Sequence, residues 1–375
     1  MRIKAAVLHK VGEPLSIEEV NLDPPRAGEV LVKMVATGIC HSDLHVITGD
    51  RPQEVFPVIL GHEGAGIVEQ VGPGVTKVAP GDHAVLTFLP ACGTCHWCRT
   101  GQSNMCDLGA LVTRGKMLDG TMRHHLADGT PVANFLFNST FGEYTVVPEA
   151  SLVKVDPEAP LERVCLLGCG FTTGYGSTTN ALKIRPGETI TIVGCGGLGL
   201  SAIQGAKNSS AGKIIAVDVH PEKLEMAKKF GATHTVQNLG DPQAVVNKIL
   251  EITWGLGTDY STEYVGFNQT EQTLFIAFYA LRKGGTMCMV GVGAHDKREL
   301  PIDPRTLTLW NKKIKGVLFG QAEFQTDIPR YVTLAKDKQI DLDGLVTREL
   351  SLDQINEGVQ AVLDGNKVAR QVIRF

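Results

Sequence analysis

Four cysteines in one short stretch of the chain have the residue type and spacing of a metal site. Cys92, Cys95 and Cys98 are separated by two residues each, and Cys106 follows shortly afterwards. Four thiolates this close together can surround one tetrahedral Zn²⁺, and a site filled by four protein sulfurs leaves no room for water or substrate. Reduced core thiols or two disulfides are the alternatives, but the repeated two-residue gap suits a metal better. We therefore predict a closed structural zinc site in a lobe at residues 90–108.

A second group of possible metal ligands is spread along the chain. Cys40, His62 and Cys169 lie in the glycine-flanked segments Gly-Ile-Cys-His-Ser-Asp, Gly-His-Glu-Gly and Gly-Cys-Gly. Two thiolates and one imidazole can hold zinc and leave its fourth position open for water or a substrate oxygen. Taken alone, each cysteine is more often a small buried hydrophobe, and a single histidine is more often a hydrogen-bonded core or surface residue. Taken together, the three residues predict a zinc site that can do chemistry.

A glycine-rich turn indicates a dinucleotide site. Gly194, Gly196 and Gly199 form a Gly-x-Gly-x-x-Gly pattern directly after the apolar run Thr-Ile-Thr-Ile-Val. On its own, such a pattern could also be only a tight strand-to-helix turn without a ligand. Asp218 ends the next apolar run about twenty residues later, where a carboxylate can accept from a ribose hydroxyl. A carboxylate at this position would repel a 2′-phosphate, so NAD is favoured over NADP, although Lys223 and a nearby histidine could soften the repulsion.

Two kinds of secondary structure must position these residues. Residues 1 to about 165 show short β patterns punctuated by Gly and Pro. Strands are expected there at Ile3–His9, Val30–Thr37, Gly66–Val71 and Tyr144–Val147. From about Thr189 strand patterns alternate with helical ones, which is typical of a doubly wound parallel sheet. Its expected strands are Thr189–Val193, Lys213–Val217, Asp259–Val265 and Thr286–Val292, with helices such as Glu222–Phe230 and Glu271–Leu281.

Composition narrows the possible partners. The 375 residues are 43% hydrophobic and 20% charged, with a net charge of −4 and no basic block, which argues against nucleic acid. No apolar run is long enough to cross a membrane, and the N-terminus has no signal-peptide pattern. The nine cysteines show no obvious disulfide framework, which favours a cytoplasmic location.

Taken together, these motifs resemble the zinc-dependent medium-chain alcohol dehydrogenases, over essentially the whole chain. The resemblance is to the branch with two zincs per subunit. It rests on the three glycine-flanked segments, the four-cysteine lobe, the run Leu-Gly-Cys-Gly-Phe-Thr-Thr-Gly-Tyr-Gly and the glycine-rich turn. It implies an α/β protein with a GroES-like β-rich catalytic domain at 1–170, a Rossmann NAD-binding domain with a doubly wound parallel sheet at 171–312, and a return to the catalytic domain at 313–375. It also implies an active site in the cleft between the domains, and a homo-oligomer, either a dimer or a tetramer.

The resemblance assigns roles to individual residues. Cys40, His62 and Cys169 would hold the catalytic zinc and the four lobe cysteines the structural one. Glu63 would lie just behind the catalytic zinc, Asp43 would orient His62, and Ser42 and His45 would relay the alcohol proton to solvent. The implied cofactor contacts are His41, Thr173, Gly194, Gly196, Gly197, Leu198, Gly199, Asp218, Lys223, Val290, Val317, Phe319 and Arg370. The implied substrate channel is apolar and consists of Phe88, Phe135, Leu136 and Leu318.

The expected reaction is the reversible oxidation of a primary alcohol to its aldehyde. Zinc would act as a Lewis acid that lowers the pKa of the alcohol, the proton would leave through Ser42, and hydride would pass to NAD. The apolar channel favours an uncharged aliphatic or aromatic alcohol as the small-molecule partner.

Three alternatives remain open. In the subgroup that oxidises the glutathione adduct of formaldehyde, an arginine stands where this chain has Ala110, an acid where it has Gln53 and a tyrosine where it has His45, so these three positions argue against a thiol adduct. Segments Cys106–Ala110, Leu118–Thr121 and Gly316–Gly320 look similar to actinobacterial nicotinoproteins, in which NAD(H) stays bound and a nitroso dye is used for assay. A non-catalytic zinc and nucleotide-binding homologue is the alternative from a different class.

Overall fold

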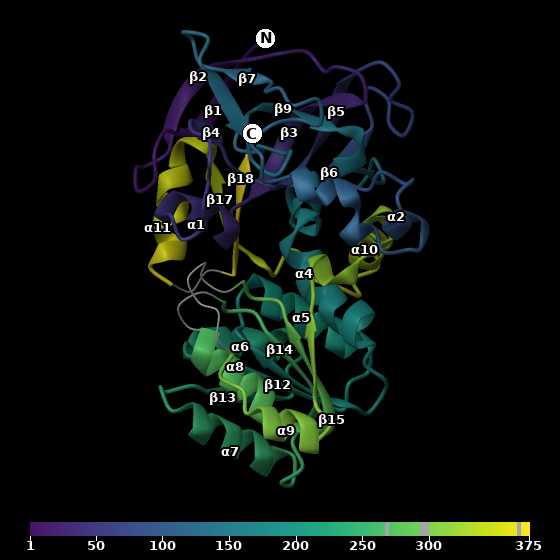
Figure 1. Ribbon diagram of the computed structural model, residues 1–375, viewed down its shortest axis with the longest axis vertical. Coiled ribbons are helices and arrows are strands. Elements are labelled where there is room, and N and C mark those ends of the chain that lie inside the picture. Colours follow the sequence, from purple (N-terminus) through teal and green to yellow (C-terminus); the bar gives the residue numbers. More distant parts are fainter. Residues whose placement is uncertain (267–269, 293–299, 366–368) are drawn as a thin grey trace. The chain divides into compact units, whose positions relative to one another are not determined.

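The computed structural model describes residues 1–266, 270–292, 300–365 and 369–375. By its contacts the chain divides into two compact units (Figure 1). Unit 1 consists of Met1–Gly170 with Glu323–Phe375, and unit 2 is Phe171–Ala322. Among the described residues no helix is both long enough and apolar enough to cross a membrane.

Unit 1 contains a closed five-stranded barrel in the order β1-β2-β7-β8-β4. The strands are β1 (Arg2–Leu8), β2 (Ser16–Leu22), β7 (His124–His125), β8 (Pro131–Asn134) and β4 (Val58–Ile59). Apolar side chains from these strands pack into one buried core with Phe135, Phe137 and Phe141, which lie in the segment after β8. The sequence after β8 therefore belongs to the interior of the barrel unit.

A seven-stranded sheet completes unit 1, in the order β10-β6-β5-β3-β18-β17, with β9 also paired to β3. Its strands are β3 (Glu29–Gly38), β5 (Glu63–Val71), β6 (His83–Leu86), β9 (Tyr144–Pro148), β10 (Leu152–Lys154), β17 (Val346–Ser351) and β18 (Arg370–Arg374). Because β3 and β5 are antiparallel, the last residue of β3, Gly38, lies opposite the first residue of β5, Glu63. This register brings the segments that carry Cys40 and His62 together.

The helices of unit 1 range from four residues in α2 to 13 in α10. They are α1 (His41–Thr48), α2 (His96–Arg99), α3 (Leu161–Val164), α10 (Phe324–Lys336) and α11 (Ile355–Leu363). Cys40 caps α1 with extended backbone, and Asp43 in the first turn accepts a hydrogen bond from the Cys40 backbone N–H at 3.0 Å. Helix α1 ends at Gly49, whose φ of 83° is the left-handed conformation that glycine tolerates best.

Unit 2 is a six-stranded parallel sheet in the order β13-β12-β11-β14-β15-β16, with helices between the strands (Figure 1). The strands are β11 (Thr189–Val193), β12 (Lys213–Asp218), β13 (His234–Gln237), β14 (Thr258–Glu263), β15 (Leu281–Met289) and β16 (Lys313–Gly316). The helices are α4 (Gly170–Gly176), α5 (Gly197–Asn208), α6 (Pro221–Phe230), α7 (Pro242–Ile252), α8 (Thr270–Tyr279) and α9 (Pro304–Leu309). The strand order reverses between β11 and β14, which is where doubly wound sheets bind ligands at the carboxyl ends of their strands.

One expected domain boundary was misplaced. We expected the catalytic domain to resume at residue 313, but β16 begins there and pairs in parallel with β15, Thr286 lying opposite Lys313. The backbone hydrogen bonds of this sixth strand hold the segment in unit 2, so the return to unit 1 comes at Glu323.

Candidate functional site

The three dispersed ligand candidates lie together in unit 1. Ligand atoms of Cys40, His62, Glu63 and Cys169 all lie within 4.8 Å of one another. Cys40 precedes α1, His62 and Glu63 lie at the start of β5, and Cys169 follows a short 3₁₀ turn at Cys165–Gly168. The β3–β5 pairing brings the first three residues together, and the turn, which contacts both strands, adds Cys169.

Asp43 holds this cluster in place from behind. Its Oδ1 lies 3.0 Å from His62 Nδ1 and accepts the Gly61 backbone N–H at 3.0 Å. Its Oδ2 accepts the Cys40 N–H, and the carboxylate is fully buried. One side chain therefore fixes both segments that present ligands.

The electrostatics of the cluster fit a metal cation. A hydrogen bond from Cys169 lowers the pKa of the Cys40 thiol well below its usual value, since this bond and the neighbouring His62 outweigh burial. Burial lowers the pKa of His62, but Asp43 and Cys40 overcome it and raise that pKa to about 10. A site that favours thiolate and attracts positive charge suits zinc.

An orphaned nitrogen gives the same indication. His62 Nε2 is buried and has no hydrogen-bond partner among the residues that the structure describes. A buried ring nitrogen without a partner is unfavourable unless a ligand completes it. With Cys40 and Cys169 beside it, the donor set of two sulfurs and one nitrogen is that of an open zinc site.

Glu63 and Arg370 form a buried ion pair at the edge of the cluster. Glu63 Oε1 accepts the Gly170 backbone N–H at 3.0 Å, and Oε2 meets the Arg370 guanidinium. A Cβ on Gly38 would lie 2.3 Å from Glu63 Oε2, so only glycine leaves room for the carboxylate there. Arg370, expected at the cofactor pyrophosphate, here lies against Glu63.

The proposed relay residues share the short helix α1. Ser42 and His45 are three positions apart, and side chains at that spacing lie on one face of a helix. The His45 Nδ1 lies 3.5 Å from Asp50 Oδ2, and its ring centroid lies 6.2 Å from that of His41. Burial lowers the pKa of His45 in spite of Asp50, so its imidazole is neutral near pH 7 and can accept a proton.

Two of the four expected channel residues border the cluster. The rings of Phe88 and Phe135 meet the His62 ring edge to face, with centroids 6.1 and 5.7 Å away. Leu136 is buried in the same core. Leu318 belongs to unit 2 and is 46% exposed there.

The lobe cysteines form the second cluster. Ligand atoms of Cys92, Cys95, Cys98 and Cys106 lie within 4.8 Å of one another, and none of the nine cysteines of the chain forms a disulfide. Backbone N–H groups of Thr94 and Cys95 point at Cys92 Sγ, at 3.4 and 3.3 Å. Burial raises the pKa of Cys92, but these and other donors bring it down to about 6, which favours the thiolate that zinc binds.

The glycine-rich turn of unit 2 has the geometry of a dinucleotide-binding loop. Gly194 has φ of 94°, and a Cβ on Gly199 would lie 1.8 Å from the Gly194 oxygen. A Cβ on Gly196, which caps α5, would meet no described atom within 4 Å, so the space beside it is open to a ligand. Gly197 and Leu198 open α5. The turn therefore leaves backbone N–H groups and a helix N-terminus accessible to an anion.

The Asp218 carboxylate borders this turn at the end of β12. It accepts backbone N–H groups of Cys195 at 2.8 Å and His220 at 2.9 Å. Lys223 lies in the first turn of α6, which follows. These contacts fix the carboxylate at the end of β12, the position from which a carboxylate can accept a hydrogen bond from a ribose hydroxyl.

The other expected cofactor residues lie in three places. Val290 and Val317 directly follow β15 and β16, where their N–H groups bond to Glu263 at 3.2 Å and Met289 at 3.0 Å. Thr173 lies in α4, and Phe319 is buried close after β16. These four belong to unit 2, whereas His41 and Arg370 belong to unit 1.

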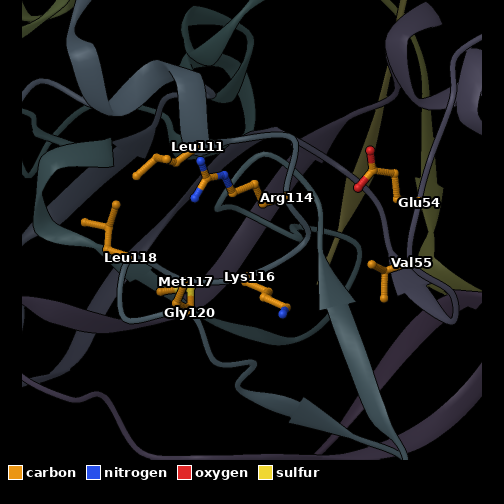
Figure 2. A pocket seen from close by; sticks show the side chains of 8 residues that line it. All are labelled: Glu54, Val55, Leu111, Arg114, Lys116, Met117, Leu118 and Gly120. Carbon is orange, nitrogen blue, oxygen red and sulfur yellow. The ribbon is translucent and has the colours of Figure 1, made fainter.

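A separate pocket of about 450 Å³ lies in unit 1 (Figure 2). Glu54 and Val55 line one side, and the 111–120 loop with Arg114 and Lys116 lines the other. Its lining includes none of the residues of the open cluster or of the four-cysteine lobe cluster.

A β-rich unit with one open and one closed thiolate cluster, in a chain that also carries a parallel sheet with a glycine-rich strand-to-helix turn, is typical of a zinc-binding dehydrogenase. Residues 26–157 match the model of the alcohol dehydrogenase GroES-like domain, and residues 197–336 match that of the zinc-binding dehydrogenases. The chain belongs to the zinc-dependent medium-chain alcohol dehydrogenases.

Relatives of the chain are named for different activities. An NDMA-dependent alcohol dehydrogenase of Amycolatopsis methanolica is 45% identical, over 98% of this chain and 98% of its own. An S-(hydroxymethyl)glutathione dehydrogenase of Escherichia coli is 40% identical over all of both chains. The crystal structure of benzyl alcohol dehydrogenase from Acinetobacter calcoaceticus has a TM-score of 0.91 at 34% identity, covering 100% of this chain and 99% of its own.

Sequence reasoning missed one residue near the open cluster. Arg51 extends over the Phe135 ring, with its Cζ 5.6 Å from the centroid. In the sequence, Arg51 is an isolated arginine shortly after a predicted metal-ligand segment, and nothing there indicates a role for it. Only the folded chain shows that Phe135 lies beneath it.

Proposed function

We propose that the protein is an NAD-dependent alcohol dehydrogenase that reversibly oxidises primary aliphatic or aromatic alcohols to aldehydes. The observation that carries this proposal is the open cluster of Cys40, His62 and Cys169, with its orphaned Nε2 and with Ser42 on the adjoining helix. The family supports the zinc and the dehydrogenase class.

Different residues of the chain would bind the two zinc ions and orient the zinc ligands. Cys40, His62 and Cys169 would hold the catalytic zinc, and Asp43 would orient His62 through its 3.0 Å contact. When bound, zinc supplies a Lewis acid that lowers the pKa of the alcohol, and NAD supplies the hydride acceptor. The four lobe cysteines would hold a second, structural zinc.

Proton movement would follow helix α1. The Ser42 hydroxyl would accept the alcohol proton as it gives its own to the neutral imidazole of His45, which passes it on to water. Phe88 and Phe135 would keep other water away from the reacting oxygen, since both pack on His62. In unit 2 the glycine-rich turn would bind the pyrophosphate and Asp218 a ribose hydroxyl.

A panel of alcohols and aldehydes tests the proposal. Purified, zinc-loaded protein should reduce added NAD with primary alcohols and oxidise NADH with the matching aldehydes. A protein that binds two zinc equivalents and NAD, yet turns over no alcohol with NAD or with a nitroso acceptor, would support the non-catalytic alternative.

Tightly bound NAD(H) is a second candidate feature, favoured by the 45% identity to an enzyme named as NDMA-dependent. In that case NAD would be reduced and re-oxidised in place. Nucleotide content after exhaustive desalting distinguishes the two. Complete loss of nucleotide, with activity restored by added NAD, would exclude a permanently bound cofactor.

A thiol-adduct substrate is less well supported, despite the 40% identity to an S-(hydroxymethyl)glutathione dehydrogenase. Ala110 offers no cation for a carboxylate, and the Gln53 amide donates to the Val55 carbonyl at 3.2 Å. Comparing S-(hydroxymethyl)glutathione with simple alcohols as substrates tests this directly.

A further inference from the structure

Arg51 lies one aromatic ring away from the open cluster. Its backbone N–H donates to the His45 carbonyl at 2.8 Å, which ties it to the end of α1. Its Cζ lies 5.6 Å from the Phe135 centroid, and the Phe135 centroid lies 5.7 Å from that of His62. The guanidinium and the cluster therefore lie within reach of one small aromatic molecule.

This guanidinium has no carboxylate partner. Arg51 is half-buried, and its side chain forms no ion pair or hydrogen bond with any residue that the structure describes. Every other described arginine that is not exposed pairs with a carboxylate. These four are Arg123 with Glu29, Arg163 with Asp343, Arg348 with Glu357 and Arg370 with Glu63. Arg51 is thus the exception among the described arginines that are not exposed.

Nearby charges do not satisfy the donors of Arg51. Burial lowers the pKa of Arg51, and the field of Asp43 and Cys40 only partly offsets that. Asp43 is already occupied, since its oxygens accept from Cys40, Gly61 and His62. A partly desolvated cation with free donors is unfavourable unless an anion completes it.

The chemistry of the site selects the kind of anion. A guanidinium presents parallel N–H donors that match the two oxygens of a carboxylate, and a cation–π contact with the Phe135 ring, 5.6 Å from Cζ to the centroid, holds the Arg51 side chain near the cluster. We propose that Arg51 binds a carboxylate at the far end of the alcohol substrate, so that the preferred substrate is a hydroxymethyl compound with an aromatic or short apolar spacer and a terminal carboxylate. This inference rests on the proposed function and replaces the uncharged substrate expected from the apolar channel.

Two substrates of equal shape provide the test. Para-hydroxymethylbenzoate and para-hydroxymethylbenzamide differ in charge but hardly in size. The wild-type holoenzyme should have the higher kcat/KM with the benzoate, and the difference should lie mainly in KM. Arg51→Gln should lower the benzoate-to-benzamide ratio by about ten- to a hundredfold, as expected when a charged hydrogen-bond donor is lost. Arg51→Lys should restore part of that ratio, because a lysine keeps the charge but not the fork.

A matched control separates contact from general electrostatics. Arg114 also has no carboxylate partner among the described residues, but it is exposed and lines the separate pocket (Figure 2). Arg114→Gln removes the same charge and should leave the ratio unchanged. An equal fall in Arg114→Gln, or no fall in Arg51→Gln, would overturn the inference even if both alcohols are oxidised. Failure to oxidise either alcohol with any acceptor would instead contradict the proposed function, and the inference with it.

Discussion

The Asp43 carboxylate lies 3.0 Å from Nδ1 of His62, and both side chains are almost completely buried. The contact fixes the orientation of the imidazole, so that Nε2 faces the sulfur atoms of the open cluster. Because the same carboxylate accepts the N–H groups of Cys40 and Gly61, it also fixes the backbone on both sides of the site. Asp43 thus controls the geometry of the open cluster.

Replacing Asp43 with Asn should weaken zinc binding at the open site by about ten- to a hundredfold. The amide keeps the size of the side chain but loses the charge that supports the imidazole. Chelator competition, followed by the zinc content of the protein, measures the effect. Asp337→Asn is the control, because Asp337 is exposed at the end of α10, far along the chain from both clusters. Unchanged chelator resistance in Asp43→Asn would mean that the carboxylate does not support the metal site.

Ser42→Ala should lower kcat by about a hundredfold, which is a typical contribution of one positioned proton-transfer group. Two zinc equivalents and the affinity for NAD should be retained, because Ser42 is not among the ligand atoms of either cluster. Ser42→Thr keeps a hydroxyl in the same place and should retain most of the activity. Full activity in the alanine variant would exclude the relay through Ser42.

Cys98→Ser should remove one zinc equivalent and lower stability more than it alters the chemistry of the molecules that fold. The closed lobe is held by four sulfurs, and structural zinc contributes folding free energy directly. Cys288→Ala is the control, since this buried thiol in β15 belongs to neither cluster and its loss should leave two equivalents. A stable Cys98→Ser protein that keeps one zinc but has lost all chemistry would mean that the roles of the two sites are reversed.

The sequence predicts the two metal sites for different reasons. The lobe cysteines are close along the chain, so their spacing alone indicates one site. Cys40, His62 and Cys169 meet only because β3 pairs with β5 and the turn before Cys169 contacts both strands. Considered one at a time, each of the three residues has an ordinary structural explanation. The three glycine-flanked segments taken together predict the open site, and the family resemblance then assigns a role to each residue.

Long-range packing accounts for what sequence reasoning missed. The contact between Arg51 and Phe135 depends on the path of the chain after α1, and the half-buried state of the guanidinium depends on that path as well. The misplaced domain boundary has a similar cause, because only the pairing of β16 with β15 assigns that segment to unit 2. The expected helix end at Leu281 is also wrong, since α8 ends at Tyr279 and Leu281 opens β15.

Alanine substitutions at two glycines of the glycine-rich turn should have different effects on stability and on NAD affinity. A Cβ on Gly199 would lie 1.8 Å from the Gly194 oxygen, so Gly199→Ala should destabilise unit 2 by roughly 1–3 kcal/mol through overpacking. Gly196 has φ of −75°, which alanine adopts easily, and a Cβ there would meet no described atom within 4 Å. Gly196→Ala should therefore melt like the wild type yet bind NAD roughly tenfold more weakly, because the methyl group occupies the space for the pyrophosphate. Calorimetric melting and NAD titration of both variants check this. Unaltered NAD affinity in Gly196→Ala would contradict binding at this turn.

A buried histidine should make stability depend on pH. His124 in β7 is fully buried, and neither ring nitrogen has a hydrogen-bond partner among the described residues. Burial, aided by His125, lowers the pKa of His124 to about 4 from the usual 6.5. Between these two values the unfolded chain binds a proton that the folded protein does not, so stability rises with pH across this range and is lost as pH falls.

His124→Phe should remove this dependence, because phenylalanine fills a similar volume and does not titrate. Each unit of pKa shift corresponds to about 1.4 kcal/mol of stability. Between pH 6.5 and pH 4 the wild type should therefore lose up to about 3 kcal/mol of its free energy of unfolding through His124. Denaturant unfolding of both proteins at several pH values gives the difference in free energy of unfolding, and losses common to both, such as protonation of the zinc ligands, cancel. His125→Phe is the control, since His125 is partly exposed and pairs with Asp23 at 3.2 Å. A difference between wild type and His124→Phe that stays constant from pH 7 to pH 4 would show that His124 is not held neutral by burial.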